Sequence, residues 1–200
     1  MDGCTTEDRV PVIYSCSQDR RTVMATEFRI VCSTTPDLLK KFGVLSGGWV
    51  ASPTTPLNEI EKKGVRGLFF FDTGALGASI DAAVAEELSL KPDGQHEVQA
   101  FNVSSSEDHY TVKIVIAAEH VPSHRKNAGM SHQLSGVTGI KNMHNRLVAI
   151  FKEEAPGRII GIIGRVFLEY TTMVYDGLSG TVTIEVDSSV LCPKPLPKLP

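Results

Sequence analysis

An acidic residue follows a short aromatic run in the first half of the chain. Phe69, Phe70 and Phe71 lead directly into Asp72, and Gly74 stands two positions later. A short apolar run bounded by a turn signal predicts a buried strand that ends in a tight loop. A carboxylate at the end of such a strand is removed from water, where its charge is costly unless it has a partner or shares a proton. We therefore take Asp72 as the candidate catalytic carboxylate.

A second apolar run ends at a glycine late in the chain. Ile159–Ile163 predicts a buried strand, Gly164 ends it, and Arg165–Tyr170 predicts a short helix. Two further β-like runs, Thr172–Tyr175 and Thr181–Val186, flank an Asp-Gly turn signal and predict a terminal hairpin.

The elements that must position these motifs are predicted to be strands joined by short helices. Two segments have Thr at a helix N-cap, Pro at the first helical position, lysines in the last turn and Gly just beyond, which predicts helices within Thr34–Val44 and Thr54–Val65. Asp81 can cap a third helix through Leu88. His120–Asn145 has no clear pattern. The predicted strands and extended segments are Arg21–Cys32, Ala78–Ile80 and Leu147–Phe151, and Leu45–Ser52 is predicted to be a turn plus a short strand.

A hairpin is predicted between the two motifs. Glu97–Val103 and Tyr110–Ala117 are β-like runs, and the polar run Ser104–Asp108 separates them. Polar residues between two β runs favour an exposed and mobile hairpin tip.

Composition argues against several classes of protein. The net charge of −3 and the pI near 6.1 argue against nucleic-acid binding. The longest apolar run, Leu68–Phe71, is too short to span a bilayer, so no membrane partner is expected. Residues 1–4 lack the basic-then-apolar pattern of a signal peptide, which predicts a cytoplasmic location. The cysteines show no CxxC pairing, which suits reduced thiols.

No metal site or cofactor is predicted. His120 and His124 have the spacing of one helical turn, but Pro122 between them disfavours a helix. No Cys or carboxylate cluster completes a ligand set around them.

The two motifs together resemble those of retropepsin-like aspartic proteases. The segment 71–75, with the helix that follows, resembles the active-site loop of that family, and 162–168 resembles its hydrophobic-hydrophobic-Gly motif with the short helix behind it. The terminal hairpin is similar to that of small stand-alone bacterial members. The resemblance covers roughly Gly64–Val186 and implies an all-β fold with a few short helices, a closed β-barrel acid protease fold. The chain then divides into an N-terminal extension of no assigned role (1–60), a protease domain (61–187) and a Pro-rich tail (188–200).

The resemblance implies a peptide hydrolase that works as a symmetric homodimer. The family needs two facing aspartates, and this chain has a single D-T-G, so each subunit would supply one Asp72. Two carboxylates about 3 Å apart cannot both ionise comfortably and share one proton. The ionised member would activate a water that attacks the peptide carbonyl, while the protonated member would polarise that carbonyl. No metal or cofactor takes part in this scheme.

The resemblance also assigns roles to the neighbouring residues. Thr73 would hydrogen-bond across the dimer, and Gly74 would let the substrate backbone approach closely. The hairpin tip, about 101–110, would be the flap that closes on substrate. The full predicted site comprises Asp72 as catalytic residue; Thr73, Gly74 and Ala75 as the active-site loop; Phe101, Asn102, Val103, Ser104 and Tyr110 as the substrate-binding flap; and Ile162, Ile163, Gly164 and Arg165 as structural support.

Two departures from the family pattern support an alternative. Leu76 and Gly77 stand where many viral members carry acidic residues that bind substrate backbone or pair with the arginine matching Arg165. The usual flap glycines are replaced by Asn102–Ser106. The alternative is a non-catalytic module that keeps this fold to bind peptides or to dimerise. A D-T-G triplet by itself is also compatible with an aspartate that only caps its own loop through backbone N–H groups.

Overall fold

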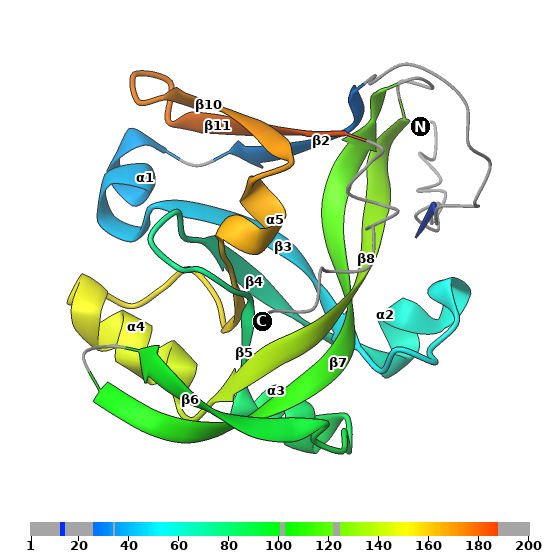
Figure 1. The fold of residues 1–200 in the computed structure, drawn as a ribbon. Coiled ribbons are helices and arrows are strands. Elements are labelled where there is room, and N and C mark those ends of the chain that lie inside the picture. Colours follow the sequence, from blue (N-terminus) through cyan, green and yellow to red (C-terminus); the bar gives the residue numbers. More distant parts are fainter. Residues whose placement is uncertain (1–12, 15–25, 34, 101–102, 122–124, 188–200) are drawn as a thin grey trace, which may run out of the picture.

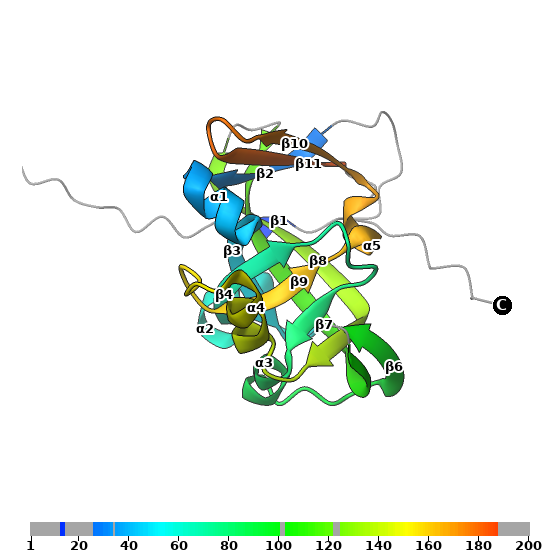
Figure 2. The same cartoon turned by 90° about the vertical axis from the view of Figure 1, so that its left-hand side faces the viewer.

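The protein is built around a closed barrel of β-strands (Figures 1 and 2). The computed structural model describes residues 13–14, 26–33, 35–100, 103–121 and 125–187. Six of its strands pair in a ring, because β7 pairs with both β8 and β3. In order around the ring they are β3 (Val44–Ala51), β4 (Val65–Phe71), β9 (Ile159–Ile163), β5 (Ser79–Asp81), β8 (Arg125–Ile140) and β7 (Val103–His120). The all-β prediction is therefore confirmed at the level of fold class.

Further strands extend the sheet outward from the ring. From β7 the order continues to β2 (Thr26–Ser33), β11 (Thr181–Asp187) and β10 (Thr171–Asp176), and the last two form the predicted terminal hairpin. β6 (Gly94–Ala100) pairs with the other end of β7, and β1 (Ile13–Tyr14) pairs with β8. Figure 1 shows β2, β10 and β11 above the barrel and β6 below it.

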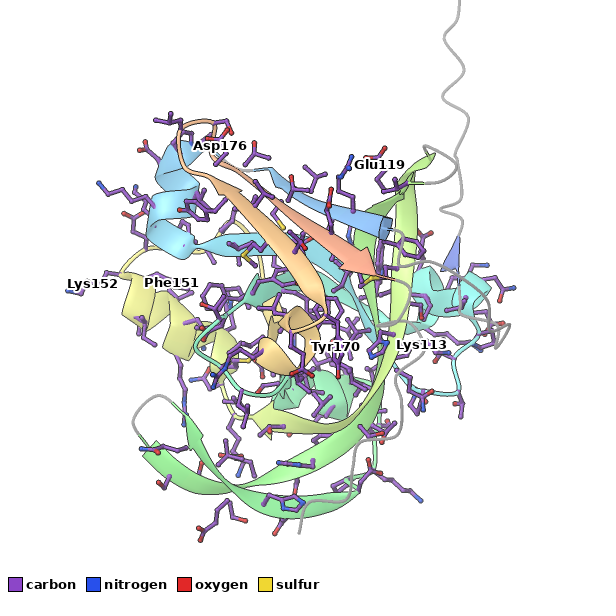
Figure 3. All side chains as sticks on the ribbon, turned by 45° about the horizontal axis from the view of Figure 1, so that its top comes forward. Lys113, Glu119, Phe151, Lys152, Tyr170 and Asp176 are labelled. Atoms are coloured by element: carbon purple, nitrogen blue, oxygen red, sulfur yellow. The ribbon has the colours of Figure 1, made fainter. Side chains whose placement is uncertain are left out.

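Short helices connect and cover these strands. They are α1 (Pro36–Phe42), the 3₁₀ turn η1 (Leu57–Glu59), α2 (Ile60–Lys63), α3 (Ala82–Glu87), α4 (Met143–Phe151) and α5 (Arg165–Leu168). The predicted cap of α3 is confirmed, since the Asp81 side chain accepts a hydrogen bond from the backbone of Ala83 at 3.1 Å. α4 is anchored by Phe151 (Figure 3), whose ring meets those of Phe42 and Phe70 edge-on.

Strand β9 is buried on both of its faces. Ile160 and Ile163 belong to the main core of the barrel, whereas Ile159 and Ile162 pack in a second cluster with Met143 and Leu147 of α4. A strand covered on both sides has no polar face, which is why its sequence is a continuous apolar run without alternation. This strand was predicted correctly.

Several predictions of local structure are wrong. Leu147–Phe151 is the end of helix α4 and not a strand, and the unpatterned segment contains the long strand β8. The predicted turn at the start of Leu45–Ser52 is absent, since β3 runs unbroken through it. Position 48 in that strand requires glycine, because a Cβ there would come within 2.2 Å of the Val115 carbonyl oxygen of β7.

The predicted division at residue 60 does not mark the edge of the barrel. β3 lies before it and is a member of the ring, paired with β4 from Val44↔Phe71 to Val50↔Val65. β2 also lies before it and pairs with β11. The described part of the N-terminal third is therefore integrated into the sheet. The predicted lead-in before β2, apart from β1, and the tail 188–200 lie outside the described residues.

Candidate active site

The D-T-G loop and the Ile-Ile-Gly motif lie side by side at one edge of the sheet. β4 and β9 are parallel neighbours, and Phe71 is in register with Ile163. The residues that follow each strand therefore emerge at the same edge. The backbone N–H of Asp72 donates to the Ile163 carbonyl at 3.0 Å, which continues the pairing one residue beyond β4.

The loop 72–77 is held by the backbone of α5. The Arg165 N–H donates to the Ala75 carbonyl and the Val166 N–H to the Leu76 carbonyl, both at 2.9 Å. These two amides at the start of a helix have no partner within the helix, so the loop supplies their acceptors. Gly164 lies against the same loop: a Cβ there would be 2.2 Å from the Gly77 carbonyl oxygen and 2.7 Å from that of Ala75. Any larger residue at this position would push the loop away.

The Asp72 side chain is half-buried and oriented by its own loop. Its Oδ1 accepts a hydrogen bond of 2.7 Å from the Gly74 N–H, and its backbone carbonyl accepts one of 3.2 Å from the Ala75 N–H. Among the described residues, Oδ2 has no hydrogen-bond partner. The carboxylate is therefore fixed at one oxygen and available at the other, and it is less buried than the aromatic run before it predicts.

The outer surface of the loop is exposed. Thr73, Gly74 and Gly77 are exposed, and the Leu76 side chain is 73% exposed. Arg165 is exposed as well. The loop is therefore open to solvent on the side away from α5.

Aromatic packing supports α5 from within. The ring of Phe167 lies 6.4 Å from that of Phe71 and 6.4 Å from that of His132 on β8. His132 is 8% exposed, and its burial lowers the pKa of the imidazole from the ordinary 6.5, so the ring is neutral at pH 7. Sequence reasoning missed this contact because His132 lies in the segment without a recognisable pattern.

The hairpin between the two motifs is formed by β6 and β7, but its boundaries differ from those predicted. The pairing runs from Gly94↔His109 to Ala100↔Val103, so the polar run 104–108 is strand and not tip. Ser104 lies opposite Gln99.

The predicted flap residues are accordingly divided between different parts of the fold. Tyr110 is 8% exposed and pairs with Val137 of β8, so it belongs to the barrel and not to the tip. Phe101 and Asn102 lie outside the described residues, and Val103 is described only by its backbone pairing. Figure 2 shows the hairpin and the loop between β4 and β5 projecting to the same side of the barrel.

Neither a metal centre nor a membrane-spanning helix is found in the described ranges. No group of three or more His, Cys, Asp or Glu side chains there is placed to hold a metal ion. None of the described helices is long and apolar enough to cross a bilayer.

Comparisons of the chain with protein-family models, curated proteins and solved structures found no match. A function must therefore be argued from the site itself.

Proposed function

We propose that this protein is an aspartic endopeptidase that acts as a homodimer, with one Asp72 carboxylate from each subunit. The observation that carries the proposal is the state of that carboxylate: Oδ1 is held by the Gly74 N–H at 2.7 Å, and Oδ2 has no partner among the described residues. Here β9, Gly164 and α5 fix the loop in place.

The dimer follows from the count of carboxylates at the site. Activation of water between two aspartates needs a second acid, and each chain supplies a single D-T-G. The exposed surface of the loop, with Thr73, Gly74 and Leu76, leaves room for the same loop of another copy. In that arrangement one carboxylate would act as general base on the water, and the other would donate a proton to the peptide carbonyl.

The direct test is cleavage of an unfolded-peptide mixture by the Asp72→Asn variant. Loss of a general base alone costs on the order of 10³-fold in rate, and a homodimer of the variant loses the acid as well, so cleavage should fall by at least about that factor. Asp37→Asn is the matched control, because Asp37 lies exposed in the first turn of α1 and should leave the rate unchanged. Undiminished cleavage by Asp72→Asn would exclude the mechanism.

A mixing experiment tests whether the site is shared. Excess Asp72→Asn chain added to a fixed amount of wild type should draw wild-type subunits into mixed dimers with one carboxylate, and activity should fall. Asp37→Asn added in the same excess should not lower it. Specific activity should also fall on dilution as dimers dissociate. Activity that withstands both treatments would exclude a shared site.

The alternative function is a non-catalytic module that binds peptides or dimerises. The specific observation that favours it is Leu76, which is exposed and apolar at a position where related sites carry an acid. A screen of the purified protein against peptides from acid to neutral pH separates the two. Binding without cleavage at any pH supports the module, and cleavage that is lost in Asp72→Asn supports the enzyme.

A further inference from the structure

The β6–β7 hairpin leaves the barrel at one residue, His109. At this position β7 is paired on both sides, with Gly94 of β6 and Thr138 of β8. Nearer the tip, the residues 103–108 of β7 pair with β6 alone. The His109 carbonyl also accepts a hydrogen bond of 2.7 Å from the Asp93 N–H, which closes the base of the hairpin. Any change in the angle of the hairpin must therefore be accommodated around His109.

A pair of histidine rings lies at this base. The rings of His96 on β6 and His109 on β7 have centroids 4.5 Å apart and are tilted by 42°. The Nε2 atom of His109 lies 3.3 Å from the Thr138 hydroxyl of β8, within hydrogen-bond distance. The two imidazoles therefore link β6, β7 and β8 on one face of the sheet.

The charged groups around the pair are distributed unevenly. Glu107 lies directly opposite His96, is largely buried, and accepts a hydrogen bond of 2.7 Å from the Ser105 hydroxyl. Its side chain lies on the same face of the hairpin as those of both His96 and His109. His109 has only the uncharged Gly94 and Thr138 opposite it.

The other acidic side chains near the base of the hairpin interact with residues other than the two histidines. Asp108 accepts a hydrogen bond from Gln95 and lies near the Tyr110 hydroxyl. Glu86 of α3 also acts on Tyr110, whose pKa is raised chiefly by burial. Asp93 accepts a hydrogen bond from the Thr111 hydroxyl. Of these acidic groups, Glu107 is the one on the face of the histidine pair, and a single carboxylate cannot balance two positive rings.

We propose that the His96–His109 pair is a pH-sensitive hinge that holds the hairpin against the barrel when the rings are neutral and loosens it when both are protonated. Two imidazolium rings in contact repel each other. The hinge goes beyond the proposed hydrolysis and does not depend on it.

The direction of the pH effect follows from linkage. Burial, and then the neighbouring His96, lower the pKa of His109 from the ordinary 6.5 in the folded hairpin. The opened hairpin therefore binds a proton more readily than the closed one. Closure is fully favoured above pH 6.5 and is weakened as the pH falls below that value.

Hydrogen exchange of backbone amides at pH 7 and pH 5.5 tests the hinge. Each rate is expressed as protection relative to the intrinsic exchange rate at the same pH. Protection in 95–100 and 103–108 should fall several-fold in acid, while the histidine-free hairpin of β10 and β11 should change little. Equal behaviour of the two hairpins would overturn the proposal. Because no substrate is involved, the result is independent of whether the protein cleaves peptides.

Substitutions identify the groups that cause the effect. His96→Gln should reduce the acid-induced loss of protection, because burial alone still lowers the pKa of His109, whereas His120→Gln, at the far end of β7, should leave that loss unchanged. Glu107→Gln removes the counter-charge of His96 and should enlarge the loss in acid. If His96→Gln already lowers protection at pH 7, Glu107→Gln provides the test instead. A loss of protection in acid equal to that of wild type in Glu107→Gln would then overturn the hinge.

Discussion

The loop that carries Asp72 and the β6–β7 hairpin are built in opposite ways. The loop is fixed from behind by backbone hydrogen bonds from Arg165 and Val166 and by close contact with Gly164, so a displacement would break several bonds at once. The hairpin is held along its outer half only by pairing between β6 and β7, and most of its side chains are polar and exposed. Buried, interlocked backbone suits a group that must keep its position, and a two-stranded arm suits one that moves.

The largest expected effect comes from Gly164→Ala. The added Cβ would come within 2.2 Å of the Gly77 carbonyl oxygen, and neither backbone can yield without breaking the bonds from α5. We expect a loss of about 3 kcal/mol in the free energy of unfolding, measured by urea denaturation. Gly77→Ala is the control, because a Cβ there has no atom within 4 Å and should cost under about 1 kcal/mol. Equal costs would show that the loop is not pinned.

Asp81→Ala should have the next largest effect. This carboxylate is 5% exposed, and its two oxygens accept backbone hydrogen bonds from Ala83 and His144. The substitution removes a helix cap and leaves two partly buried backbone donors without their acceptor, which should cost about 2 kcal/mol in urea denaturation. Asp37→Ala, on the exposed surface of α1, should cost under about 0.5 kcal/mol. If Asp81→Ala costs no more free energy of unfolding than Asp37→Ala, the end of β5 is held by other contacts.

A smaller effect is expected from acid, through His132. Burial lowers the pKa of this imidazole below 6.5, so protonation favours the unfolded chain and global stability should fall as the pH drops below 6.5. Removal of the titrating ring in His132→Gln should make the fall less steep. Urea denaturation at pH 7 and pH 5 measures both slopes. Identical slopes for wild type and His132→Gln would mean that acid destabilises the protein through groups other than His132.

The smallest effect should come from the hairpin itself. Gln95 donates a hydrogen bond of 2.7 Å to Asp108 across its exposed face. Gln95→Ala should change the free energy of global unfolding by less than about 0.5 kcal/mol. A loss comparable to that of Gly164→Ala would mean that the hairpin is part of the same cooperative unit as the loop, and the contrast between the two regions would be lost.

The parts predicted well from sequence are those whose pattern reflects local packing. The phenylalanines before Asp72 and the isoleucines before Gly164 were predicted to be strands because both runs are short and apolar. The resemblance of the two motifs to one family then predicted that the second motif supports the loop of the first. The Asp-Gly turn between β10 and β11 is likewise encoded locally: Asp176 accepts hydrogen bonds from Leu178 and Ser179 at the turn (Figure 3).

The parts predicted poorly are those imposed by distant neighbours. β8 is rich in Gly, Ser, His and Asn, and it is a strand because β7 pairs along most of its length. α4 is flanked by Asn142 and Lys152, both with positive φ, and it lacks the side-chain cap by which a sequence signals a helix. The run 104–108 looks like a turn because it is polar, but its partner is β6 and its polarity reflects an exposed arm.

The parallel pairing of β4 with β9 has a consequence for the order of events during synthesis. Phe71 and Ile163 come from opposite halves of the chain, so their register can form only after the intervening segments have been made and folded back. A nascent chain that has emerged only as far as α4 carries Asp72 on a loop without β9 and α5 behind it. The acidic group thus acquires its fixed geometry only after β9 and α5 have been made, long after its own strand has left the ribosome.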